Sequence, residues 1–194
     1  MKELARQHGI VALSSNYALY ADMSSRAVSI LREYSPNVEV YSIDESFLSL
    51  NGLDRLWPSF ADMGQSMRQR VLQWTGLPVC VGVGPSKTLA KLAIHIAKKN
   101  SRFNGVCDLA AMQPAEMDAL LAGIGVGEVW GVGRRIEAHL QAAGIRTVKD
   151  LRDAPLAWLR SSFDVVMGAQ ETSCGLSCLP LEEVAPTKEQ NVRQ

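Results

Sequence analysis

Two adjacent carboxylates, Asp44 and Glu45, interrupt a stretch that otherwise has the composition of a buried strand, VEVYSIDESFLSL at residues 38–50. Like charges side by side repel each other and lose hydration energy when they are buried. A divalent cation would remove the repulsion, because Mg²⁺ binds one or two carboxylates together with the phosphates of a substrate. The alternative is the end of a strand, where water or a salt bridge neutralises both side chains.

The alternation of residues 38–50 predicts a single strand, which the turn signal Asn51-Gly52 would end. Successive side chains of a strand point to opposite faces, so Asp44 and Glu45 would lie on opposite faces. The face of Asp44 would carry small polar side chains, and that of Glu45 would carry apolar ones. We therefore expect a sheet that is packed on helices behind and open in front, with Asp44 on the open side.

A second stretch, GVGPSKTLAKLA at residues 82–93, predicts an anion site. A strand over 77–84 would lead into a turn, and Ser86 can cap the following helix, whose free N–H groups attract anions. Lys87 and Lys91 lie four residues apart on one helical face, so both could reach the same polyphosphate. The stretch is not a P-loop, since Ser86 stands where that motif has glycine. An ordinary capped helix with exposed lysines remains the alternative.

A third stretch, GVGEVWGVGRRIEAHLQAAGIRTVKDL at residues 125–151, predicts a helix–hairpin–helix. Gly131 and Gly133 would form its tight turn and let the backbone approach DNA phosphates. Arg134 and Arg135 would begin the second helix, whose N-terminus favours anions. Contacts of this kind position a duplex without reading its bases. The pattern also occurs as plain helix packing, but the two arginines favour DNA.

Composition narrows the class of protein without naming a partner. The 194 residues contain 20 basic and 20 acidic side chains, but seven basic and two acidic ones fall within residues 61–115. This local excess is either a solvated helix face or a surface that meets phosphates. The four cysteines have neither zinc-site nor disulfide-framework spacing, and neither a secretory signal nor an apolar run of bilayer length is visible. A reducing, cytoplasmic setting without a membrane partner is therefore expected.

The order of the predicted elements indicates an α+β fold. Periodicity and capping residues predict helices over 14–34, 59–74 and 87–99, with strands over 38–50 and 77–84 between them. This order is typical of a sheet packed on helices, up to about residue 110. From residue 115, short glycine-broken helices continue to about 165 without strand signals, and the remaining residues are polar and extended. We expect the four tryptophans to pack these helices rather than to stack on bases.

Taken together, five stretches resemble the Y-family of translesion DNA polymerases, and specifically its UmuC branch. They are SSNYALYADMS, LREYSPNVEVYSIDESF, VGVGPSKTLAKLAIHIAKK, VWGVGRRI followed by GIRTVKDL, and LEEVAPTK, in the order and spacing of the family. The resemblance implies an α+β fold: a partial polymerase palm, followed by a small all-helical thumb with the helix–hairpin–helix. It divides the chain into a remnant of the fingers region (1–12), the palm (13–112), the thumb (113–165) and a linker toward a little-finger domain (166–194).

The resemblance also implies roles for the residues of the first two stretches. Asp44 and Glu45 would bind the catalytic Mg²⁺ ions. Lys91 would contact the triphosphate of an incoming dNTP, with Ser86 and Lys87 near the same phosphates. The implied reaction is two-metal nucleotidyl transfer, used for error-prone synthesis across damaged template in the SOS response.

In the third stretch, the resemblance implies that Gly131, Gly133, Arg134 and Arg135 hold the backbone of primer–template DNA. Accessory polymerase subunits and a sliding clamp are the further partners that it implies. The alternative from another class is a non-catalytic DNA-binding or interaction protein, which would use the same hairpin and the basic helix at 87–102.

The chain departs from the family pattern at both ends. In the family, a preceding strand carries another metal-binding aspartate, whereas MKELARQHGIVAL at residues 1–13 contains no Asp. The rest of the fingers and the little finger have no counterpart either. We therefore expect this sequence to be an internal segment of such a polymerase.

Overall fold

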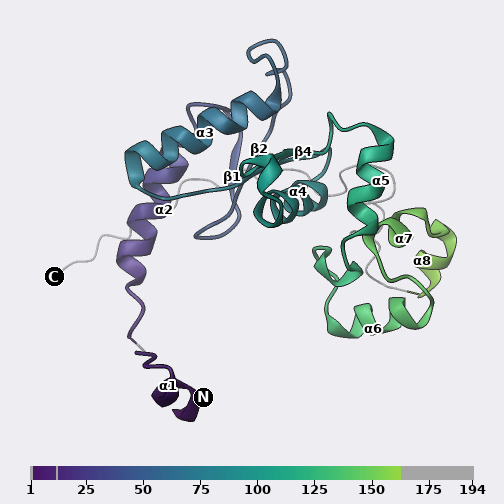
Figure 1. The fold of residues 1–194 in the computed structure, drawn as a ribbon. Helices are drawn as coiled ribbons and strands as arrows, with labels where there is room; N and C mark the ends of the chain where they lie inside the picture. Colours follow the sequence, from purple (N-terminus) through teal and green to yellow (C-terminus); the bar gives the residue numbers. More distant parts are fainter. Residues whose placement is uncertain (1, 12, 163–194) are drawn as a thin grey trace.

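The computed structural model describes residues 2–11 and 13–162, so the predicted linker at 166–194 lies outside the described residues. In chain order its elements are α1 (Lys2–Gln7), α2 (Tyr17–Leu31), β1 (Val38–Val40), β2 (Ser46–Leu48), α3 (Phe60–Thr75), β3 (Val81–Val83), α4 (Lys87–Lys99), the 3₁₀ turn η1 (Ser101–Phe103), β4 (Val106–Asp108), α5 (Pro114–Ala122), the 3₁₀ turn η2 (Val126–Glu128), α6 (Arg134–Ala142), α7 (Val148–Asp153) and α8 (Leu156–Ser162). Figure 1 shows the strands in the middle of the molecule, the group α5–α8 at one end, and α1 away from the rest at the other. The predicted α+β class is confirmed.

The predicted single strand over 38–50 is wrong, because the segment folds back on itself as an antiparallel hairpin. β1 and β2 pair along their whole length, and residues 41–45 connect them. The hydroxyl of Ser42 donates to Asp44 Oδ1 over 2.7 Å and accepts from the Asp44 backbone N–H. Short polar side chains that bond to nearby backbone in this way favour a turn over a continued strand. The alternation of apolar residues alone could not reveal this reversal.

β3 and β4 form a second sheet, which is parallel and lies against α4. Gly82 in β3 comes so close to α4 that a Cβ at this position would stand 2.2 Å from the carbonyl oxygen of Ala90. Only glycine allows such an approach. β4 did not stand out in the sequence, because a strand of three residues is too short for periodicity to identify.

Helix α4 has the bounds and the buried face that the sequence predicts. Ser86 is its N-cap, and the apolar residues on its inner face are buried: Leu89, Leu92, Ala93 and Ile96. Cys107 of β4 is fully buried in the same core. Burial raises the pKa of its thiol to about 12, so this cysteine is an inert core residue.

Helices α2 and α3 pack against each other beside the hairpin. Ser59 caps α3 and accepts a hydrogen bond from the Asp62 N–H, as the predicted helix start requires. The first turns of α2 are more exposed than their spacing predicts, since 74% of Tyr17 and 48% of Tyr20 is accessible. The packing of α2 is therefore concentrated in its second half, where Val28 and Ile30 are buried.

Short helices follow from residue 114, as predicted, but the first half of the predicted helix–hairpin–helix is only the 3₁₀ turn η2. The main hydrophobic core runs from Leu92 and Ile96 of α4 to Leu121, Leu140 and Leu151 of the later helices. It is thus continuous across the palm–thumb boundary that the resemblance implies, and that boundary stays a prediction. None of the helices within the described residues combines the length and the apolar character that crossing a membrane requires.

Candidate functional site

The turn between β1 and β2 contains both predicted acids, Asp44 and Glu45. Asp44 is exposed, and its side chain accepts the hydrogen bond from Ser42. Glu45 exposes 39% of its side chain and places Oε2 3.0 Å from Nζ of Lys91. The two acids therefore lie in the turn of a hairpin and not within a strand, and each has a different partner. We call residues 41–45 the carboxylate turn.

A buried ion pair fastens this hairpin to α4. Nζ of Lys87 lies 2.9 and 2.7 Å from the two carboxylate oxygens of Glu39 in β1. The lysine and glutamate side chains are only 10% and 6% exposed. A carboxylate buried to this degree is costly unless a cation and hydrogen bonds compensate it. The Lys87 ammonium, which the sequence placed near a triphosphate, thus has a partner inside the protein.

Lys91 lies one helical turn further along α4 and contacts aromatic rings as well as Glu45. Its ammonium lies 4.9 Å from the centre of the Tyr41 ring and 4.5 Å from that of Trp130. Both distances fall within the range of cation–π attraction. The Lys91 side chain is 21% exposed. The carboxylate turn, α4 and the segment around residue 130 therefore meet at this lysine.

Three rings make a cluster at the same place, which we call the aromatic cluster: Tyr41, Phe47 and Trp130. Tyr41 contacts Phe47 and Trp130 edge-on, at centroid distances of 5.7 and 5.3 Å, and Phe47 stacks on Trp130 at 6.1 Å. Lys87 lies 5.4 Å from the centre of the Phe47 ring. For Trp130 the expectation that tryptophans pack rather than stack on bases is therefore consistent with the contacts.

Ser86 has the local role that its position predicts. It is buried, and its hydroxyl oxygen accepts a hydrogen bond from the N–H of Leu89 at 3.2 Å. This bond satisfies one of the N–H groups that begin α4. Its proximity to a triphosphate stays a prediction.

The turn before α6 presents its positive charges to solvent. Gly131 has a φ of +91°, a conformation that favours glycine. Gly133 is the N-cap of α6, and among the described residues no side chain caps this helix. Arg134 and Arg135 follow directly, and both are exposed. The helix start therefore combines accessible N–H groups with two cations, an arrangement suited to phosphate.

Most of the basic excess within residues 61–115 serves internal contacts instead. Arg68 donates to the backbone carbonyls of Val79 and Asn104. Arg70 and Arg102 form ion pairs with Glu33 and Glu116, while Lys98 and Lys99 at the end of α4 are exposed. This segment is therefore not a continuous surface of free positive charge.

The acids of the carboxylate turn suit a hard divalent cation. Within residues 2–11 and 13–162, no group of three or more His, Cys, Asp or Glu side chains is placed to hold a metal ion. Asp44 and Glu45 offer oxygen ligands, the donors that such cations prefer, and Asp44 is open to solvent. The pair fits a cation that completes its coordination with water or substrate phosphate.

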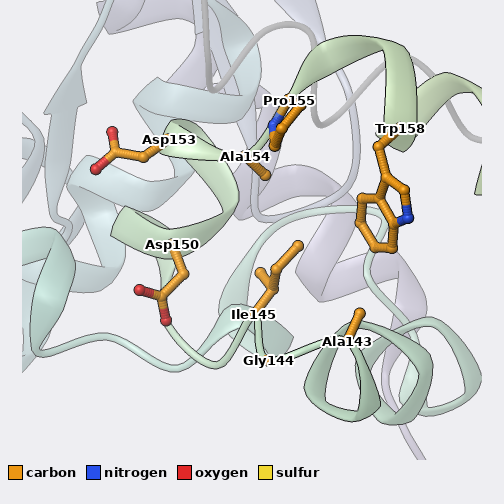
Figure 2. A pocket seen from close by; sticks show the side chains of 8 residues that line it. All are labelled: Ala143, Gly144, Ile145, Asp150, Asp153, Ala154, Pro155 and Trp158. Carbon is orange, nitrogen blue, oxygen red and sulfur yellow. The ribbon is translucent and has the colours of Figure 1, made fainter.

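A pocket of about 330 Å³ lies elsewhere, among α6, α7 and α8, and contains none of the predicted site residues. Figure 2 shows the indole of Trp158 on one side of it, with the carboxylates of Asp150 and Asp153 directed away from that ring. Hydrogen bonds from Arg152 and then Lys149 lower the pKa of Asp153 to about 2. These acids are bound within the helical segment and are poor candidates for chemistry.

Three residues that shape the site were not predicted from the sequence: Glu39, Tyr41 and Trp130. Glu39 had a visible signal, since it is an acid between two valines of a short apolar strand. Tyr41 and Trp130 had none, because they are 89 positions apart and only the tertiary structure brings their rings together.

Comparisons with known proteins show what the chain is similar to. The model of the impB/mucB/samB family matches residues 1–95. Protein UmuC of Salmonella typhimurium is 47% identical over 193 residues, which are 98% of this chain and 45% of that protein. DNA polymerase IV of Moorella thermoacetica is 33% identical over 82% of this chain and 38% of that protein. The chain therefore spans less than half the length of these relatives.

Solved structures share the fold. The crystal structure of a DinB family error prone DNA polymerase from Sulfolobus solfataricus matches with a TM-score of 0.69 at 23% identity, covering 89% of this chain and 50% of that one. The insertion ternary complex of Dbh DNA polymerase matches with a TM-score of 0.67 at 22% identity, covering 89% and 49%. The sequence resemblance is thereby confirmed: residues 1–95 match the impB/mucB/samB family model, and nearly the whole chain is similar to protein UmuC.

Proposed function

We propose that this chain is the palm and thumb segment of an error-prone translesion DNA polymerase, which adds dNTPs to primer–template DNA. Residues 13–112 are the palm and residues 113–165 the thumb in this proposal. It is supported by relatives named UmuC and DNA polymerase IV and by the shared polymerase fold. The bacterial cytoplasm, accessory subunits and a sliding clamp belong to the same proposal.

The observation that carries the proposal is the contact between Lys91 and Glu45, the neighbour of Asp44 in the carboxylate turn. Lys91 and Glu45 are 46 positions apart in the chain, yet their side chains form an ion pair of 3.0 Å. Two carboxylates beside a lysine on a helix provide ligands for metal ions and a cation for polyphosphate in one place. Mg²⁺ bound there would lower the pKa of the primer 3′-hydroxyl and stabilise charge on the leaving pyrophosphate.

The residues of the chain would divide the work as follows. Asp44 and Glu45 hold the cations, and Lys91 exchanges the Glu45 carboxylate for oxygens of the triphosphate. Lys87 acts mainly by holding β1 on α4 through Glu39, and Ser86 by capping α4 beside the phosphates. Together these contacts keep the carboxylate turn and the lysine at a fixed spacing, which positioning catalysis needs.

The turn before α6 would hold the duplex. Gly131 and Gly133 let the backbone come near a DNA phosphate, and the accessible N–H groups of α6 attract it. Arg134 and Arg135, the first two residues of α6, add exposed positive charge next to the turn. Such contacts fix the position of DNA without reading its sequence, as a polymerase requires.

The test is single-nucleotide primer extension with the purified chain, Mg²⁺ and dNTPs. We expect Asp44→Ala to abolish insertion and to leave duplex binding largely intact, because the DNA contacts are assigned to Gly131, Gly133 and the two arginines and not to Asp44. Asp54→Ala is the matched control, since Asp54 is also an exposed aspartate, in the loop after β2, and should have wild-type activity.

Equal insertion by the wild type and Asp44→Ala would refute the assignment of the metal site. A folded wild-type chain that binds duplex but inserts no nucleotide would instead favour the non-catalytic DNA-binding protein.

A further inference from the structure

We propose that Trp130 is a positioning residue that holds the Lys91 ammonium at the carboxylate turn. This inference rests on the proposed function, in which Lys91 binds the triphosphate. It adds a residue from the segment that precedes the DNA-facing turn, immediately before Gly131. Trp130 would thus connect the nucleotide site with the place where DNA is held.

The contacts of Lys91 support this role. Its ammonium lies between the Glu45 carboxylate, 3.0 Å away, and the rings of Tyr41 and Trp130, 4.9 and 4.5 Å away. A lysine side chain has four rotatable bonds and is ordinarily mobile. Contacts on several sides restrict it to one conformation, and its low exposure of 21% strengthens the attraction to the rings.

The ring of Trp130 is itself held in place. It stacks on Phe47 of β2 with planes 29° apart and meets Tyr41 edge-on at 82°. Both partners belong to the hairpin that carries Asp44 and Glu45. Trp130 is therefore fastened to the carboxylate side of the site, whereas its backbone continues into Gly131 and the start of α6.

A consequence is that the two binding events affect each other. When a polyphosphate takes Lys91 from Glu45, the ammonium changes its position relative to the indole, and the surroundings of Trp130 change with it. The change at Trp130 would in turn alter the affinity for duplex at the turn that follows it. Because linked equilibria are reciprocal, bound duplex would then change the affinity for polyphosphate by the same factor.

The first experiment needs no ligand and no activity. The chain has four tryptophans, so its 5-fluorotryptophan form should give four ¹⁹F resonances, of which Trp130→Phe removes one. We expect Lys91→Met to shift the Trp130 resonance and to leave that of Trp57 in place, since Trp57 stacks on Tyr34 in a different cluster. An unmoved Trp130 resonance would overturn the proposed contact.

The second experiment measures affinity for inorganic tripolyphosphate in the presence of Mg²⁺ by calorimetry. We expect Trp130→Leu to weaken binding about three- to tenfold, whereas Trp130→Phe, which keeps a ring, stays within about twofold of the wild type. Trp57→Leu is the matched control, because it removes another partly buried, stacked tryptophan.

The outcomes separate this inference from the function on which it rests. Equal weakening by Trp130→Leu and Trp57→Leu would mean general destabilisation and would refute a positioning role. A wild-type chain that binds no tripolyphosphate would refute the triphosphate site, and the role of Trp130 with it, while the Lys91→Met spectrum still decides whether the contact exists. Non-additive effects of Trp130→Leu and Lys91→Met on affinity would support both.

Discussion

The charged side chains around the carboxylate turn are mostly paired within the protein, whereas those at the start of α6 are exposed to solvent. Around the carboxylate turn, Glu39 and Glu45 each pair with a lysine of α4, and the Glu39 pair is buried. At the start of α6, Arg134 and Arg135 are exposed. The first region is held together by ion pairs between distant segments, whereas the second leaves its cations accessible to a partner.

The difference teaches how each region is stabilised. The hairpin has strands of only three residues, so it depends on its contacts with α4 and with the aromatic cluster. The helical segment has local caps and an apolar core, including Leu140 of α6 and Val148 of α7. Arg134 and Arg135 are exposed and lie outside this core, so we expect them to serve binding and not stability.

The largest expected effect follows from breaking the buried ion pair. Lys87→Met leaves the Glu39 carboxylate buried without the ammonium, so we expect the free energy of unfolding to fall by about 3 kcal/mol. Urea denaturation measures the loss. The double variant Glu39→Leu with Lys87→Met should recover much of it, because a matched apolar pair often replaces a buried ion pair.

If Lys87→Met unfolds at the wild-type urea concentration, the pair does not stabilise the hairpin. The contrast between a region held by ion pairs and a region held by caps and core would then be wrong.

The second largest effect concerns DNA binding by the two arginines at the start of α6. Replacing both Arg134 and Arg135 by Gln should weaken duplex binding about tenfold while leaving the melting temperature unchanged. The slope of log K against log salt should fall by about 1 for each phosphate contact that is lost. Lys98 and Lys99, exposed on α4 and replaced in the same way, are the matched control. An equal loss from that control would favour the basic helix as the DNA surface.

The smallest effect concerns a local cap. Thr147 and Asp150 form a capping box at the start of α7, with hydrogen bonds of 3.0 Å from the Asp150 N–H and 2.9 Å from the Thr147 N–H. We expect Thr147→Ala to lower the free energy of unfolding by about 1 kcal/mol, measured in urea. An unchanged urea midpoint would contradict a stabilising role for this cap.

The same box predicts the direction of a pH effect. Hydrogen bonds from the backbone N–H groups of Thr147 and Arg146, and then from the Thr147 hydroxyl, lower the pKa of Asp150. Because the pKa of Asp150 is lower in the folded state, its carboxylate stabilises the fold at pH values above the unfolded-state pKa. This stabilisation is lost as the pH falls through the folded-state pKa. The loss of unfolding free energy caused by Thr147→Ala should therefore be smaller below about pH 4 than at neutral pH. An equal loss at these two pH values would contradict this.

Features that depend on near neighbours in the chain could be predicted from the sequence. Ser59 and Ser86 mark the starts of α3 and α4, and the apolar spacing of α4 identifies the residues that are buried. The carboxylate pair and the turn at Gly131 were also recognisable, because residue type and spacing carry their chemistry. The split of residues 38–50 into two strands was not, since alternation continues on both sides of the reversal.

What the sequence by itself determined was which side chains could do chemistry: Asp44, Glu45, Lys91 and the two arginines that begin α6. Only the tertiary structure decided their partners. It placed Lys87 on Glu39, Lys91 between Glu45 and Trp130, and the Arg134–Arg135 pair in solvent. The physical reason is that helix caps and periodicity act over a few residues, whereas ion pairs and ring contacts depend on distances in space that chain separation does not encode.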